Sequence, residues 1–275
     1  MIKRSFNYLI PYDENDLIRV GNKSDGGYVI SKKSLEKDHF LLSFGMSNDW
    51  SFEEEFVKFD LNNFVNIYDH TVDLNFFLLR LYKPIKRLFY FKSSFKNIAN
   101  KTNELFKYLR LKKSKITHYK KKISDDQSFL SKNLSESILD ANYPGKIMLK
   151  MDIEGDEFNI LKDINLHSEK IHTLIVEFHD LDIRLIEFEI LIKEIQKKYY
   201  IIHIHGNNIT GVLENGLPKT LEVTFLNRND FFKDNKQSRF NFPIEKLDFL
   251  NHPYMEDIKI NFEKTIENDI SDPIL

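Results

Sequence analysis

Four carboxylates cluster in the middle of the chain, directly after an apolar, strand-like run. They are Asp152, Glu154, Asp156 and Glu157, and an amphipathic, helix-like pattern resumes after them. Because the ligands of an open α/β sheet collect outside the carboxyl ends of its strands, we predict that these acids hold a substrate, a metal ion or a cofactor. The alternative is that Asp152 caps the helix and that the other acids only complement its N-terminal dipole.

Polar residues also lie at or just after the ends of two later strand-like runs, 173–178 and 199–204. They are Glu177, His179, His205, Asn207 and Asn208. If these runs and 147–151 are neighbouring parallel strands, all of these side chains surround one crevice. Carboxylates and imidazoles together suit a divalent ion such as Mg²⁺ or Mn²⁺, or a general base that takes a proton from a hydroxyl. His179 and His205 are the candidate bases because histidine titrates near neutral pH, although a lone histidine is more often a structural hydrogen-bonding group.

Two stretches of the N-terminal half add candidate binding residues. Asp25-Gly26-Gly27 is a turn signal between two short alternating runs, which predicts a hairpin and places Tyr28 where it could stack on a ligand or hydrogen-bond to it. An ordinary tight turn explains this stretch equally well.

The second stretch predicts a buried strand from Phe40 to Gly45, a polar loop that includes Ser47, and a helix with an acidic first turn. Gly45 permits the close approach of a nucleotide-like ligand. The loop lacks the G-x-G-x-x-G pattern, which disfavours pyrophosphate binding. A second strand ends at Asp69, roughly 20 residues after Gly45, which is the usual spacing for a carboxylate that binds ribose hydroxyls.

Residues 74–122 are strongly basic, with 15 Lys and Arg residues and a single acid, Glu104. Five apolar residues at helical spacing predict one or two amphipathic helices before a strand at 116–119. They are Phe76, Leu79, Leu88, Phe91 and Phe95. The segment 80–122 could bind a phosphorylated or nucleotide-linked substrate, or make peripheral contact with an anionic membrane that carries a lipid-linked substrate. A solvated basic face without further function is the alternative.

Strand-like runs alternate with helical patterns along the chain, which predicts an α/β fold with a parallel sheet and right-handed crossovers. A long helix is expected at 181–198. Its apolar positions include Ile183, Ile186, Ile190 and Ile195. The run 220–225 follows Asn208 with no room for a helix, so we expect it to be antiparallel, at or near the sheet edge. We expect a single domain, 1–275, with an irregular C-terminal wrap over 229–275.

The composition excludes several classes of protein. With 275 residues and 41% hydrophobic residues the chain can bury a large core. Forty basic and 42 acidic residues leave a net charge of −2, so nothing global indicates nucleic-acid binding. The absence of cysteine excludes disulfides, thiolate metal sites and cysteine nucleophiles. No apolar run approaches the ~20 residues of a membrane helix, and we expect a cytoplasmic protein.

The central acidic segment also carries a family signature. Lys150-Met-Asp-Ile-Glu-Gly-Asp-Glu157 matches K-x-D-x-E-G-x-E, and on this motif the chain resembles the FkbM-type methyltransferases, which use S-adenosylmethionine and commonly modify hydroxyls of glycans and natural products. A branch associated with surface polysaccharides is similar in further segments, and the resemblance spans roughly residues 17 to 262. These segments are Asp25-Gly-Gly-Tyr-Val29, Ser43-Phe-Gly45, Phe52-Glu53, His205-Gly-Asn-Asn208 and Leu221-Glu-Val-Thr224.

The resemblance implies a class I methyltransferase fold, which is Rossmann-like, with a mostly parallel seven-stranded sheet whose last strand is antiparallel. It implies S-adenosylmethionine as the cofactor, with the Gly45 loop beside its methionine part and Asp69 on its ribose. The expected cofactor contacts are Gly45, Ser47, Asp69, Asp25, Tyr28 and Asp152. Many relatives carry D-x-G-A-x-x-G in the first loop, and only Gly45 of that pattern is present here.

The implied reaction is O-methylation of a sugar, or of a phosphorylated or nucleotide-linked precursor of a surface polysaccharide such as a capsule. The expected substrate-binding residues are Glu154, Glu177, Asn207 and Asn208, and the expected catalytic residues are Asp152, His179 and His205. A divalent ion, Mg²⁺ or Mn²⁺, on Asp152 and His179 is a further hypothesis. Two alternatives stay open. One is a metal-dependent hydrolase or sugar-modifying enzyme that uses the same cluster, and the other is a non-catalytic binding protein with a methyltransferase fold.

Overall fold

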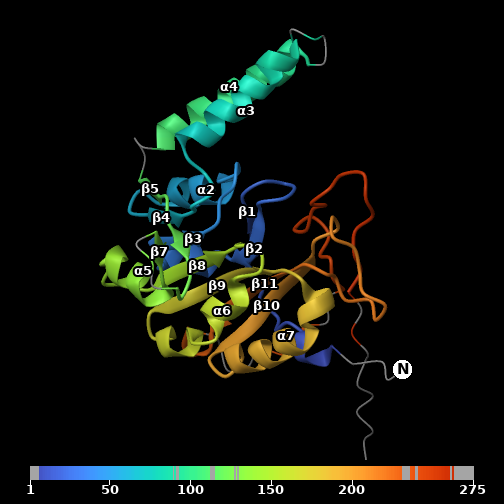
Figure 1. Ribbon diagram of the computed structural model, residues 1–275. Coiled ribbons are helices and arrows are strands. Elements are labelled where there is room, and N and C mark those ends of the chain that lie inside the picture. The colour runs from blue at the N-terminus through green and yellow to red at the C-terminus, as the bar shows by residue number, and fades with distance from the viewer. Residues whose placement is uncertain are drawn as a thin grey trace, which may run out of the picture.

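One seven-stranded sheet forms the centre of the protein (Figure 1). The structure is a computed structural model, and it describes residues 6–88, 90, 93–111, 115–126, 128, 130–230, 236–238, 241–260 and 262. The strands follow the order β10-β11-β9-β8-β3-β4-β5 across the sheet. Their bounds are β3 Phe40–Phe44, β4 Phe64–Tyr68, β5 Ile116–Tyr119, β8 Ile147–Met151, β9 Ile171–Phe178, β10 Tyr199–Gly206 and β11 Leu221–Asn227.

Two smaller strand pairs lie outside this sheet. The antiparallel hairpin of β1 (Leu17–Val20) and β2 (Tyr28–Ser31) confirms the turn predicted at Asp25-Gly26-Gly27. The other pair, β6 (Lys122–Ile123) and β7 (Ser131–Lys132), is parallel and was not expected from the sequence.

The strand directions confirm the predicted fold class. Four neighbouring pairings in the large sheet are parallel, and β11 is antiparallel to both of its neighbours, β9 and β10. This is the mostly parallel sheet with an antiparallel last strand that the class I methyltransferase fold requires. The expectation that β8, β9 and β10 are three adjacent strands is wrong in one respect, because β11 lies between β9 and β10. The short connection after β10 lets β11 fold back antiparallel, and β11 then pairs on both sides.

Helices cover both faces of the sheet. Their bounds are α1 Lys32–Lys37, α2 Ser51–Phe59, α3 Leu74–Leu88, α4 Phe95–Leu111, α5 Leu134–Ala141, α6 Glu157–Leu161 and α7 Leu181–Ile195, with 3₁₀ turns η1 Asn7–Leu9, η2 Ile164–His167 and η3 Arg228–Asp230. Successive strand residues point to opposite faces. Leu42 and Leu149 therefore pack in a core with α5, α6 and α7, while Leu41 and Met148 pack in a second core with α2, α4 and β2.

The basic insertion forms a helical pair. Helices α3 and α4 lie side by side and extend away from the sheet (Figure 1), which confirms that amphipathic helices precede β5. Phe77, Tyr108 and Leu111 anchor the pair in the second core. Two residues expected on its apolar face, Leu79 and Phe95, are instead 59% and 78% exposed. Six residues of the predicted insertion lie outside the described residues. They are Phe89, Phe91, Lys92, Lys112, Lys113 and Ser114.

Helix α7 corrects another expectation. It packs through Phe188, Ile192 and Ile195, which are fully buried and follow a spacing of three or four residues. Three of the four isoleucines predicted as its apolar positions form a separate stripe that faces outward. They are Ile183, Ile186 and Ile190, at 80%, 63% and 59% exposure. The sequence contains two apolar stripes on this helix, and only contact with the sheet decides which one is buried.

The described part of the C-terminal tail is irregular. After η3, residues 236–238, 241–260 and 262 contain isolated β-bridges at Gln237, Phe242 and Ile260, and no helix or strand of the sheet. Residues 263–275 and several earlier positions of the predicted wrap lie outside the described residues. Among the helices that the structure describes, none is both long enough and apolar enough to cross a bilayer.

Candidate active site

A line of residues crosses the carboxyl edge of the sheet. Phe44 and Met151 end β3 and β8 and pair with one another, and Met151 also pairs with Val176 inside β9. The residues that follow these three therefore lie next to one another. Glu222 of β11 pairs with Glu177 on one side and with His205 on the other. The resulting row, from β3 to β10, is Gly45, Asp152, Glu177, Glu222 and His205.

Gly45 is the point where the first strand meets the acidic segment. Its φ of +83° is a conformation that favours glycine, and a Cβ atom here would lie 1.8 Å from the carbonyl oxygen of Asp152. The Asp152 N–H donates to the carbonyl of Phe44 at 2.9 Å. Residues 45 and 152 therefore meet, and any side chain at position 45 would push the two loops apart.

Substituting Gly45→Ala should lower the free energy of unfolding by about 2–3 kcal/mol. Alanine at this position would have a strained, positive φ angle, and its Cβ atom would also clash with the backbone of Asp152. Gly211→Ala is the matched control, since Gly211 has a φ of +81° and an added Cβ would meet nothing within 4 Å. Urea unfolding of both variants separates the steric contribution from the strain. If both variants lost the same free energy of unfolding, the added methyl group at position 45 would not clash with the Asp152 backbone.

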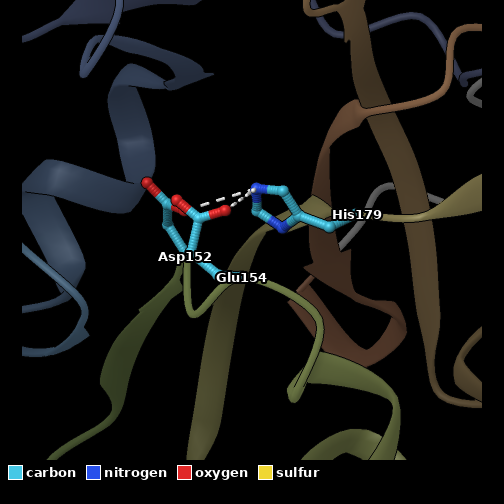
Figure 2. A group of neighbouring side chains, drawn as sticks. All are labelled: Asp152, Glu154 and His179. Atoms are coloured by element: carbon cyan, nitrogen blue, oxygen red, sulfur yellow. Dashed lines mark ion pairs between the residues drawn. The ribbon is translucent and has the colours of Figure 1, made fainter. Parts of the chain in front are cut away.

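Asp152, Glu154 and His179 form a cluster above this edge. Figure 2 shows the imidazole of His179 pointing at both carboxylates. Its Nε2 lies 3.8 Å from Asp152 Oδ1, 3.6 Å from Glu154 Oε2 and 3.9 Å from Glu177 Oε1. The Tyr28 hydroxyl completes the cluster, 3.4 Å from Asp152 Oδ2 and 3.3 Å from Glu177 Oε2. Tyr28 thus reaches the cluster from the β1–β2 hairpin.

Glu157 holds the acidic loop and the histidine together. Its buried carboxylate accepts hydrogen bonds from the N–H groups of Ile153 and Gly155, and its Oε1 lies 3.0 Å from His179 Nδ1. Helix α6 begins at Glu157 with Asp156 at its N-cap position. The alternative in which Asp152 caps this helix is therefore wrong, and Asp152 is left to face the cluster.

Burial and neighbouring charges shift the protonation of the cluster. Burial raises the pKa of Asp152 to about 6, against the attraction of Lys150 and His179. Burial also raises the pKa of Glu177 well above its usual value, and the charge of Asp152 adds to the effect. Burial lowers the pKa of His179, but the hydrogen bond to Glu157 and the surrounding carboxylates outweigh it and raise the pKa to about 10. With these pKa values, Asp152 is mostly ionised at neutral pH and lies beside a protonated imidazole.

A buried ion pair that was not predicted from the sequence lies beneath the cluster. Lys150 Nζ lies 3.2 Å from Glu53 Oε1, and both side chains are almost completely buried. Lys150 also donates to the carbonyl of Gly45 at 3.3 Å, and its ammonium lies 5.3 Å from the ring centroid of Tyr28. A lysine inside an apolar strand was the available signal, because a buried cation needs a carboxylate partner.

A cavity of about 320 Å³ opens beside the cluster. It lies over the carboxyl ends of β3, β4 and β8, and its size is within the range of ligand pockets. It is lined by Gly45, Met46, Ser47, Tyr68, Asp69, His70, Thr71, Lys121, Lys122, Ile123, Asp152, Ile153, Glu154 and Asp156. Four predicted cofactor contacts, at positions 45, 47, 69 and 152, therefore line one cavity.

Asp69 organises the wall of this cavity. One carboxylate oxygen accepts from the N–H groups of Met46 and Ser47, both at 3.0 Å, and the other accepts from the N–H and hydroxyl of Thr71 at 2.7 and 2.6 Å. Burial opposes the ionised form, but these hydrogen bonds lower the pKa of Asp69 below its usual value. Asp69 thus shapes the loop after Gly45, a role that the sequence analysis did not anticipate.

The remaining predicted site residues divide into two groups. Asn207 joins the cluster, since its Nδ2 donates to Glu177 Oε1 at 2.8 Å. His205, Asn208 and Asp25 face the C-terminal segment instead. His205 is 1% exposed and lies 3.2 Å from Glu222 and 3.3 Å from Asp257.

Asn208 and Asp25 bind the same C-terminal segment. Asn208 Nδ2 donates to the carbonyls of His252 and Met255, and the Asp25 carboxylate accepts from Asn251. The expectation that all the polar strand ends surround one crevice is therefore wrong for these positions. The inserted strand β11 separates β10 from β9, and the C-terminal segment covers the edge of the sheet there.

Comparison with known proteins adds distant similarity in fold. No protein-family model and no curated protein matches the chain. Among solved structures, the fibrillarin pre-rRNA processing protein of Methanococcus jannaschii is 10% identical, over 70% of this chain and 67% of that one, with a TM-score of 0.35. A dimethyladenosine transferase from Plasmodium falciparum is 10% identical, over 72% and 59%, with a TM-score of 0.37.

A third structure, the precorrin-6Y C5,15-methyltransferase of Geobacter metallireducens, is 10% identical over 70% of this chain and 84% of that one, with a TM-score of 0.34. The fold assignment itself rests on the order and direction of the strands. By that topology, the chain has the class I methyltransferase fold.

Proposed function

We propose that the protein is an S-adenosylmethionine-dependent O-methyltransferase that acts on a sugar hydroxyl of a phosphorylated, nucleotide-linked or lipid-linked precursor of a surface polysaccharide. The observation that supports this most is the position of Asp152. Its side chain lines the cavity over β3, β4 and β8 and also belongs to the cluster with His179. A cofactor in that cavity and an acceptor on that cluster would meet at this carboxylate.

The residues present fit such a cofactor. Gly45 lines the cavity and lets its loop meet the backbone of Asp152, and Asp69 holds the amides of Met46 and Ser47 in the cavity wall. When bound, S-adenosylmethionine supplies an electrophilic methyl group. The protein's part is to align an acceptor hydroxyl and to take its proton, which Asp152 can do because it is mostly ionised at neutral pH. His179 and Asn207 would orient the acceptor.

Binding of S-adenosylhomocysteine, measured by calorimetry, tests this proposal. We expect micromolar affinity, and an Asp69→Asn variant should bind at least 10-fold more weakly, because a hydrogen bond to a charged group contributes about 1.5–3 kcal/mol. A second ligand, an analogue of S-adenosylhomocysteine without the ribose hydroxyls, serves as the comparison. Asp69→Asn should lose much less affinity for this analogue, because neither the unaltered protein nor the variant can form the hydrogen bond from Asp69 to the ribose.

The analogue distinguishes the two roles of Asp69. An equal loss of affinity for both ligands would mean that Asp69 acts only through the Met46–Ser47 loop. No binding of S-adenosylhomocysteine by the unaltered protein would reject the methyltransferase proposal and leave the hydrolase or the non-catalytic binding protein.

We propose further that the α3–α4 pair contacts an anionic membrane that carries the acceptor. Leu78, Tyr82 and Phe106 on the pair are 45%, 57% and 55% exposed. Its exposed basic residues include Lys83, Lys86, Arg87, Lys96, Lys107 and Arg110. Exposed aromatic and aliphatic groups beside lysine and arginine suit the surface of an anionic bilayer.

Changing Lys83, Lys86 and Arg87 to Gln should weaken binding to phosphatidylglycerol-containing vesicles about 100-fold, at roughly 1 kcal/mol per basic residue. Co-sedimentation at low and high salt measures this. A triple Gln variant of Lys193, Lys197 and Lys198, which lie in and just after α7, controls for net charge. Vesicle binding that is unaffected in the first variant, or equally affected in both, would argue against this surface.

A further inference from the structure

His179 has the surroundings of a metal-binding histidine. Its Nδ1 lies 3.0 Å from Glu157 Oε1, and the buried Glu157 is fixed by two backbone N–H groups. The imidazole is therefore oriented by a carboxylate behind it, which leaves Nε2 to face the cluster. Histidine ligands of metal ions are commonly held in this way, by a hydrogen bond from the second ring nitrogen to a carboxylate.

The atoms around Nε2 have the spacing of ligands that share an ion. Asp152 Oδ1 and Glu154 Oε2 lie 3.8 and 3.6 Å from it, and the three ligand atoms lie within 4.8 Å of one another (Figure 2). These distances are longer than direct hydrogen bonds. Metal–ligand bonds of roughly 2.0–2.2 Å place neighbouring ligand atoms roughly 3–4 Å apart, so one ion fits between these atoms with little movement.

The charge of the cluster also favours a cation. Glu154 is 86% exposed, and its only ion pair among the described residues is with His179. Lys150, beneath the cluster, is already paired with Glu53, and Lys122, at the cavity, is paired with Asp156. The carboxylates of Asp152, Glu154 and Glu157 therefore converge on a single imidazole. Two carboxylates with one imidazole are a ligand set for a borderline divalent ion such as Mn²⁺.

We propose that Asp152, Glu154 and His179 bind one divalent cation of the Mn²⁺ type, with Glu157 as the residue that positions the imidazole. A catalytic role for this ion rests on the proposed function. At the edge of the cavity the ion would bind the acceptor oxygen and lower the pKa of its hydroxyl, and Asp152 would take the released proton on the carboxylate oxygen that does not bind the ion. As a binding site, it does not depend on the identity of the methyl donor.

Mn²⁺ titration followed by electron paramagnetic resonance tests the site without an activity assay. We expect one saturable Mn²⁺ site in the unaltered protein. Glu154→Gln and His179→Gln should each weaken it at least 10-fold, and Glu157→Gln should weaken it roughly 10- to 100-fold through the imidazole. Glu154 is exposed, so its variant tests binding without a risk to folding. Asp180→Asn, which removes an exposed charge next to His179, is the matched control and should bind Mn²⁺ within threefold of the unaltered protein.

Two results would overturn the site. One is the absence of saturable Mn²⁺ binding, and the other is an affinity in Glu154→Gln equal to that of the unaltered protein. The protonated His179 would then be the cation of the cluster. S-adenosylhomocysteine binding, measured on the same samples, separates this failure from that of the proposed function. Mn²⁺ binding without S-adenosylhomocysteine binding would keep the ion site and reject the methyltransferase.

Discussion

Replacing Asp152 with Asn is expected to lower kcat for methyl transfer by about 10²–10⁴-fold, the usual contribution of a positioned acid or base. Asn keeps the size of the side chain and one oxygen, but it can neither take a proton nor carry the negative charge that faces His179. Asp152 lies where the cavity and the cluster meet, so both the alignment and the deprotonation of the acceptor depend on it. The loss should be larger in kcat than in KM.

The measurement is single-turnover transfer of a labelled methyl group to a sugar acceptor, with calorimetry of S-adenosylhomocysteine on the same protein. Cofactor affinity should change only a few-fold, because the wall of the cavity is held mainly by Asp69. Asp180→Asn, which removes a neighbouring exposed carboxylate, is the control and should keep near-normal turnover. An Asp152→Asn enzyme with normal kcat would remove Asp152 from the reaction.

Removing Lys150 should have the largest effect on stability. Lys150→Met leaves Glu53 buried without its cation, and breaking a buried ion pair in this way costs about 3–5 kcal/mol. The double variant Lys150→Met with Glu53→Gln should recover much of that loss, because the uncompensated charge is gone. Urea unfolding followed by the fluorescence of Trp50, the single tryptophan of the chain, measures the effect.

Lys58→Met is the matched control for this experiment. Lys58 pairs with Glu54 on the same helix, but its side chain is 74% exposed, so its loss should cost less than about 1 kcal/mol. A Lys150→Met loss as small as that of Lys58→Met would show that water reaches the pair. No recovery in the double variant would show that Lys150 acts through its contacts with Gly45 and Tyr28 instead.

Local sequence was a good guide to the elements that carry the site. The apolar runs before Gly45, Asp69 and Asp152 are strands β3, β4 and β8, and each ends where the polar residue begins. A continuous run of apolar residues and the abrupt break that ends it are local signals, which the sequence displays directly. The turn at Asp25-Gly26-Gly27, and with it the position of Tyr28 in a hairpin, could be predicted for the same reason.

Contacts between distant segments could not be predicted. The pairs Glu157–His179 and Lys150–Glu53 join residues on different elements, and so does the bond from Asn207 to Glu177. Each depends on which strands are adjacent, and hydrophobic periodicity carries no information on strand order. The lack of information on strand order also explains why His205 was wrongly expected in the same crevice as Asp152. Its partner Glu222 comes from β11, which inserts between β9 and β10.

The sequence by itself determined that this is an α/β protein, where its central strands end, and that carboxylates and histidines follow those ends. Only the tertiary structure decided which of these groups meet. It brought Asp152, Glu154 and His179 together beside the cavity and turned His205 toward the C-terminal segment. The physical reason is that burial and charge depend on every element packed around a side chain, whereas a strand or a turn depends mainly on its own residues.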